Sequence, residues 1–201
     1  MPRGFSSDER DRVRQKIIDV GLELFGKFGI RKTNIEDITK HCGIAKGTFY
    51  LFFPSKEQLF LHIFTAVSAE MHQSLFKTLL ASRVPPKEKL KTFLRAQYQA
   101  IGKNPIFNIV FNKEEMEYLL RKNPEALSLL SAQLDEQQYI PFIEQMKQVG
   151  ILKDIDNLLA IGELKLVFLL FSHRADYSAK VYDLIFERLL DLVTYDIARE
   201  A

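Results

Sequence analysis

The sequence has one cysteine and no tryptophan among its 201 residues. A single cysteine excludes an intramolecular disulfide. Long apolar runs are also missing, because the most apolar stretch, residues 158–171, is too short to span a membrane and contains Glu163 and Lys165. The first residues are polar and charged rather than an apolar signal segment. We therefore expect a cytoplasmic protein with no membrane partner.

Signatures of catalysis and of metal binding are equally scarce. The sequence has no glycine-rich phosphate loop and no serine nucleophile elbow. His41 and Cys42 are adjacent but lack the paired spacing of zinc ligands, and Cys42 is expected to serve packing. We expect no metal, no cofactor and no enzymatic activity. One acidic cluster is expected to face solvent: Glu114, Glu115 and Glu117.

Apolar residues recur with helical rather than alternating periodicity along almost the whole chain, which predicts an all-α fold. Ser6 and Glu9 predict a capping box at the start of the first helix, which should end at Gly29. Ser55 should cap a long helix that runs to about Leu80. Further helices are expected to open at Pro85-Pro86, Asn104-Pro105 and Asn123-Pro124. Pro141 should kink or split the last of these, which should end at Gly150, and two more helices should cover residues 156–173 and 178–198.

Between the first and the long helix, the sequence predicts two short helices joined by a glycine turn. Thr33 and Glu36 have the spacing of a capping box for the first of them. Gly43 stands where the turn needs a positive φ angle, which glycine adopts without a Cβ clash. Phe49 should face inward from the second helix. Its outward face has the small and polar side chains that a recognition helix in a major groove needs: Ala45, Lys46, Gly47, Thr48 and Tyr50.

This stretch resembles the signature of the TetR family of transcriptional regulators. The matching residues are Gly43-Ile44-Ala45-Lys46-Gly47-Thr48-Phe49-Tyr50, Phe53, Ser55-Lys56-Glu57 and Leu59, preceded by Ile18, Leu24, Phe25 and Gly29. The specific resemblance covers about the first 60 residues. The sequence differs from the family pattern at Thr39, at Ala45, where the family has a capping hydroxyl, and at Leu51 and Phe52.

The resemblance implies an amino-terminal helix-turn-helix DNA-binding domain in residues 1–56. A long helix would join it to a helical effector-binding and dimerisation domain in residues 57–201. The implied function is a ligand-responsive repressor that binds a palindromic double-stranded operator as a homodimer and is released by a small hydrophobic or aromatic effector. The alternative is a helical protein-interaction module without specific DNA binding.

The family resemblance also assigns candidate DNA-binding residues. Lys56 and Tyr50 are expected to contact phosphates, and Lys46 is expected to approach base edges. The full set is Thr33, Asn34, Ala45, Lys46, Gly47, Thr48, Tyr50, Leu51, Phe52 and Lys56. Charge supports this end of the chain, since residues 1–56 hold 11 Lys and Arg against 7 Asp and Glu, whereas residues 57–201 hold 17 against 19. By itself, a solvated basic face explains the same excess.

Aromatic and methionine side chains in the remaining sequence could line an apolar cavity for the effector. The candidates are Met71, Phe93, Tyr98, Phe107, Phe111, Met116, Tyr118, Tyr139, Phe142, Met146 and Phe168. For any one of these residues, a place in an ordinary core is the competing interpretation.

The last two predicted helices are expected to form the dimer interface. The helix over residues 156–173 has little polar surface, so it must be covered on more than one side. The final helix carries an apolar stripe that could pair with it and with a symmetry mate. Interface candidates are Leu164, Phe168, Phe171, Leu184, Ile185, Leu189, Leu192 and Val193. A helix central to the monomer remains the alternative.

Overall fold

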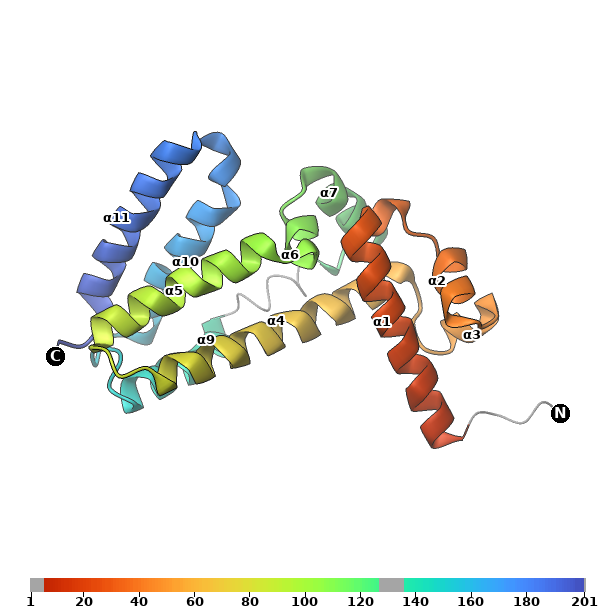
Figure 1. Cartoon of the computed structure of the whole chain (residues 1–201), viewed down its shortest axis with the longest axis horizontal. Helices are drawn as coiled ribbons and strands as arrows, with labels where there is room; N and C mark the ends of the chain where they lie inside the picture. Colours follow the sequence, from red (N-terminus) through yellow and green to blue (C-terminus); the bar gives the residue numbers. More distant parts are fainter. Residues whose placement is uncertain (1–5, 127–135, 201) are drawn as a thin grey trace. The chain divides into compact units, whose positions relative to one another are not determined.

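A computed structural model describes residues 6–126 and 136–200, and these residues form the expected all-α fold (Figure 1). The helices are α1 Ser7–Lys32, α2 Ile35–Cys42, α3 Lys46–Tyr50, α4 Lys56–Ala81, α5 Pro86–Lys103, α6 Pro105–Val110, α7 Lys113–Lys122, α9 Glu136–Gln148, α10 Asn157–Ser172, the 3-10 turn η1 Arg174–Asp176 and α11 Ala179–Ile197. Within the described residues no helix is long and apolar enough to cross a membrane.

The described chain divides into two compact units. The first unit contains residues 6–68 and 103–126, and the second contains Ala69–Gly102 and residues 136–200. In the first unit α1 packs against α2, α6 and α7, and in the second α10 packs against α9 and α11. The long helix α4 is continuous from one unit to the other, since its residues up to Ser68 belong to the first and the rest to the second.

Most predicted helix ends are confirmed, because they depend on local chemistry. Ser6 caps α1 in a reciprocal capping box with Glu9, and the Ser55 hydroxyl accepts from the amide of Gln58 at 3.2 Å. Asn104 caps α6 and is followed by proline. The Asp156 carboxylate accepts from two amides at the start of α10. These side chains satisfy amides that lack a partner within the helix.

Two predicted boundaries, after Asn104 and at Asn123, differ from the structure. Asn112 caps a new helix, α7, so the segment that begins at Asn104 is split in two rather than continuous. Pro141 lies inside a helix as predicted, and it does not split that helix, α9. Asn123 ends α7, and most of the helix predicted to open at Asn123-Pro124 falls on residues 127–135, outside the described part of the chain.

Closely packed phenylalanines form the core of the first unit. Phe25, Phe49 and Phe60 are fully buried, and the rings of Phe25 and Phe60 meet edge to face with centroids 5.7 Å apart. A Cβ on Gly21 would lie only 2.9 Å from a methyl carbon of Leu59, so α1 and α4 approach closely here. The close fit leaves little room for movement between these two helices.

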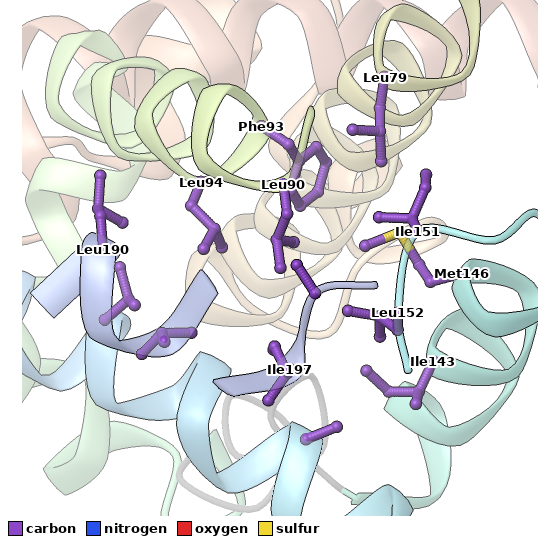
Figure 2. Close-up of a cluster of buried hydrophobic side chains, with 14 of the residues drawn as sticks. Leu79, Leu90, Phe93, Leu94, Ile143, Met146, Ile151, Leu152, Leu190 and Ile197 are labelled. Carbon is purple, nitrogen blue, oxygen red and sulfur yellow. The ribbon is translucent and has the colours of Figure 1, made fainter. Parts of the chain in front are cut away.

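The core of the second unit is drawn from α4, α5, α9, α10 and α11 (Figure 2). Leu90, Leu190 and Ile197 are among its fully buried residues. At one side, the Arg95 guanidinium binds the Glu187 carboxylate through two hydrogen bonds of 3.0 and 2.7 Å, which ties α5 to α11. After α9 the chain turns at Gly150, whose φ is 73°. An antiparallel bridge then joins Leu152 to Ala198.

Candidate functional site

The turn between α2 and α3 has the geometry that the sequence predicts. Gly43 adopts φ 69° and ψ 34°, and its amide donates to the carbonyls of Lys40 and Thr39. This is the left-handed region, where an L side chain is strained. A Cβ at Gly43 would meet nothing within 4 Å. The backbone conformation, not lack of space, therefore favours glycine at this position.

Helix α3 presents one buried and one exposed face. Phe49 is fully buried, with its ring centroid 6.2 Å from that of Phe53. Ala45 stands at the N-cap position without a side-chain cap, as its methyl group requires. The exposed residues are Ala45, Lys46, Gly47, Tyr50 and Leu51, while Thr48 and Phe52 are half-buried. A small, cationic and aromatic surface of this kind is suited to close approach by another molecule.

Lys46 forms an exposed ion pair with Glu36 of α2, with a nitrogen to oxygen distance of 2.5 Å. The hydrogen bond between them lowers the pKa of Glu36 and raises that of Lys46. Solvent screens exposed pairs of this type, so they contribute little to stability. An incoming anion could therefore replace Glu36 as the partner of Lys46 at small cost.

Lys56 has a different environment. Its Nζ donates to the carbonyl oxygens of Ile30 at 2.7 Å and Thr33 at 2.6 Å, and lies 5.1 Å from the Tyr118 ring centroid. Burial lowers the pKa of the Lys56 ammonium. In this structure Lys56 therefore holds the end of α1 in place, which its local sequence does not indicate.

Thr33 does not form the predicted capping box with Glu36. The N-cap residue of α2 is Asn34, which makes no side-chain cap hydrogen bond. Thr33 is only 2% exposed, and its hydroxyl donates to the carbonyl of Gly29 at 2.7 Å. The prediction was wrong because the hydroxyl satisfies the end of α1 instead of the start of α2. Asn34 remains exposed.

Glu115 corrects the expectation that its acidic cluster faces solvent. Helix α1 is interrupted at Gly29, with φ 78° and ψ 174°. Directly after this break, the amides of Ile30 and Arg31 donate to Oε2 of Glu115 at 2.9 and 3.1 Å. A Cβ at Gly29 would lie 2.6 Å from Oε1 of the same carboxylate. Residues 85 positions apart meet here, so no local pattern could have predicted the contact.

A second contact of α7 involves Tyr118 and Glu57. The Tyr118 hydroxyl donates to Oε1 of Glu57 at 2.8 Å, and Glu57 is only 7% exposed. Burial, helped by this hydrogen bond, raises the pKa of Tyr118 to about 12. Glu114 forms an ion pair with Arg31 at the same side of α7. Helix α7 is thus fastened to the end of α1 and the start of α4 by polar side chains.

The second unit contains a cavity of about 300 Å³. Five predicted effector residues line it: Phe93, Tyr98, Tyr139, Phe142 and Phe168. The sequence did not assign the other lining residues to an effector site, and two of them, Leu164 and Phe171, were predicted at the dimer interface. These other residues are His72, Gln73, Phe76, Leu94, Gln97, Ile101, Leu164, Lys165, Val167 and Phe171. They come from α4, α5 and α10, so their convergence follows from helix packing rather than from sequence spacing.

Two polar side chains meet on the cavity wall. The amide nitrogen of Gln97 lies 3.1 Å from Nε2 of His72. Burial lowers the pKa of His72, so a neutral imidazole accepts this hydrogen bond at pH 7. Burial also raises the pKa of Tyr139. The wall is otherwise mostly aromatic and aliphatic.

The remaining effector candidates lie outside the residues that line this cavity. Phe107, Phe111, Met116 and Tyr118 belong to the first unit. Met146 is fully buried in the core of the second, and Met71 is half-buried on α4. These residues are of the same aromatic and methionine types that were expected to line a cavity. The sequence alone therefore could not distinguish them from the residues that do line it.

Helices α10 and α11 expose an apolar face. The exposed side chains are Leu158, Leu159, Leu166 and Leu169 on α10, and Val181, Leu184, Ile185 and Leu192 on α11. Leu184 is 65% exposed. Three predicted interface residues, Leu184, Ile185 and Leu192, belong to this face, whereas Phe171 and Val193 are buried within the monomer. Leu164 and Phe168 line the cavity, and Leu189 packs against the core.

Together, α2, the Gly43 turn and α3 define a helix-turn-helix protein, whose second unit carries a separate apolar cavity. Residues 17–63 match the family model described as bacterial regulatory proteins, tetR family. The amino-terminal part of the chain therefore contains a TetR-family helix-turn-helix segment. Its resemblance to this family, inferred from the Gly43–Tyr50 run, is therefore confirmed.

Relatives cover different shares of the chain. The uncharacterised helix-turn-helix regulator YerO of Bacillus subtilis is 33% identical over 106 residues, which are 51% of this chain but only 36% of YerO. The repressor KstR2 of Rhodococcus jostii is 24% identical over 76% of this chain and 74% of its own. The crystal structure of RolR with the ligand resorcinol has a TM-score of 0.59 at 22% identity, covering 93% of this chain and 90% of RolR. This last likeness shows the fold.

Proposed function

We propose that the chain is a DNA-binding transcriptional repressor that acts in the cytoplasm and responds to a small effector. The exposed face of α3, held by the Gly43 turn and the buried Phe49, carries this proposal. The name of KstR2 as a transcriptional repressor supports the direction of regulation. In this proposal residues 1–56 bind DNA, and residues 57–201 bind the effector and form a homodimer.

The DNA surface would be α3 and the start of α2. Lys46 would exchange Glu36 for a base edge or a phosphate, and Tyr50, 48% exposed, would donate its hydroxyl to a phosphate. Gly47 and Ala45 would let the backbone of α3 approach the groove closely. Lys56 would contribute indirectly, by holding the end of α1 from which α2 starts.

The apolar face of α10 and α11 would join two copies of the chain. Exposed leucines on both helices support this, since large contiguous apolar patches on soluble proteins mark interaction sites. A two-fold dimer would present two α3 helices to half-sites about 34–36 Å apart. The double variant Leu184→Glu/Leu192→Glu should yield a monomer in sedimentation velocity. Val84→Glu changes an exposed apolar residue outside α10 and α11 and should leave the dimer intact. A dimer that survives the double substitution would contradict this interface.

Effector binding in the cavity would alter DNA affinity through α4, which contributes residues to both units. A coupling free energy of about 1–3 kcal/mol would change operator affinity about 5- to 150-fold. By linkage, operator DNA must weaken effector binding by the same factor.

Gel shift with the full chain tests the proposal. The probes are duplexes carrying inverted repeats from the DNA upstream of its own gene, with shuffled duplexes as controls. One palindrome should bind about a thousandfold tighter than the shuffled DNA. Equal affinity for all duplexes, or none, would contradict the proposal and favour a protein-interaction module.

A further inference from the structure

The walls of the cavity restrict the chemistry of its occupant. We propose that the cavity binds a small aromatic carboxylate, with its ring among the phenylalanines and its carboxylate on His72 and Gln97. This inference rests on the proposed function, because it names the class of effector for the cavity of the second unit.

Several aromatic rings line the cavity and favour a flat ligand. Phe76 and Phe93 both pack against Phe142, with centroid distances of 5.3 and 5.8 Å. Tyr98 meets Phe171 edge to face at 5.1 Å. A ligand ring can continue such edge-to-face and offset contacts, which aromatic pairs prefer. The volume of about 300 Å³ lies at the small end of ligand sites and suits one or two rings.

The charges on the wall favour an anion. The described residues that line the cavity include one basic residue, Lys165, and no aspartate or glutamate. A cationic ligand would have no carboxylate to compensate its lost hydration. An anionic ligand would gain from Lys165 and from the amide of Gln97.

His72 can supply a second charge when the ligand requires it. The groups that share the cavity wall with it are Gln97 and Tyr98 on α5, Tyr139 on α9 and Lys165 on α10. None of these residues is an aspartate or glutamate, and burial is the cause of the lowered pKa of His72. A carboxylate beside the imidazole would favour its protonated form. Binding should therefore take up a proton.

Isothermal titration calorimetry with the full chain tests the ligand class. The probes are 1-naphthoate, the neutral 1-naphthamide and the cation 1-naphthylmethylammonium. Naphthoate should bind at least about tenfold tighter than the amide, as a charged hydrogen bond allows, and the cation should bind weakest. Measured in two buffers of different ionisation enthalpy, naphthoate binding should show proton uptake. If the amide or the cation bound as tightly as naphthoate, or naphthoate did not bind, the proposal would be overturned.

Variants identify the group that takes up the proton. The affinity of wild-type protein for naphthoate should rise as pH falls from 8 to 6, by up to about tenfold per pH unit. His72→Gln and His72→Leu should both remove this dependence. His173→Asn is the matched control, because His173 ends α10 in the same unit and does not line the cavity. A pH dependence that persists in both His72 variants would overturn the proposal. Gel shift without ligand separates this failure from that of DNA binding itself.

Discussion

The two units use their buried space differently. In the first unit the fully buried Phe25 and Phe60 rings meet directly, and Lys56 and Glu115 are fixed by several hydrogen bonds each. The second unit also gathers aromatic side chains, but around a cavity of about 300 Å³. A surface that recognises the shape of another molecule requires a rigid scaffold, whereas a ligand site requires unfilled volume. Aromatic side chains therefore fill the core of the first unit, whereas in the second unit they also line a cavity.

The largest expected effect comes from the same substitution made in both units. Phe25→Ala should lower the free energy of unfolding by about 3–5 kcal/mol, since a fully buried ring would leave a cavity. Phe142→Ala should cost less, because its ring already lines an empty space. Urea denaturation followed by circular dichroism measures both. Equal losses would contradict the distinction between the two units.

A smaller effect is expected for the anchor of α7. Glu115→Ala leaves the amides of Ile30 and Arg31 without their acceptor and should destabilise the protein by about 1–3 kcal/mol. Glu117→Ala, on an exposed neighbour, should change stability by less than about 0.5 kcal/mol. Urea midpoints of the two variants provide the measurement. Matching midpoints would mean that the anchor contributes nothing.

Substitutions of two lysines in the first unit should have different effects, one on DNA affinity and the other on stability. Lys46→Ala should reduce the salt dependence of operator binding by about 1 per subunit without lowering the melting temperature. Lys56→Ala should do the reverse, because its ammonium holds the carbonyls of Ile30 and Thr33. Fluorescence anisotropy at several salt concentrations and thermal melts distinguish the two outcomes. A reduced salt slope for Lys56→Ala would instead support the phosphate contact that the sequence predicts for Lys56.

The smallest expected effect is a pH dependence in the second unit. Burial and the neighbouring Asp196 raise the pKa of Glu163 from 4.5 to about 7. The folded state therefore holds this proton more tightly than the unfolded state, so its contribution is complete below pH 4.5 and is lost as pH rises through 7. The melting temperature of the wild type should fall between pH 5 and 8 more than that of Glu163→Gln. Parallel curves for the two proteins would contradict the assignment.

Local signals in the sequence predicted the all-α fold and helix α3 with its preceding turn. A cap or a turn depends on residues a few positions apart, as at Ser6 with Glu9 and at Gly43. Thr33 shows the limit of such signals, because its hydroxyl had two possible partners and the more distant one prevailed.

Contacts between distant residues could not be predicted in the same way. His72 and Gln97 are 25 positions apart and meet only because α4 and α5 supply the same cavity wall. Aromatic composition indicated a cavity but did not separate Phe93, which lines it, from Phe107, which packs in the other unit. The polar residues that give the cavity its chemistry carried no signal in one sequence.

Gly29 and Gly43 both have positive φ angles, but they differ in which substitutions they would tolerate. Gly43 lies in the left-handed helical region with open space around it, so asparagine could replace it at modest cost. Gly29, with ψ near 180°, occupies a region that almost only glycine adopts, and its missing side chain leaves the space that the Glu115 carboxylate fills. Among diverging descendants of this sequence, position 43 could therefore change to asparagine without a change elsewhere. Position 29 can change only together with position 115.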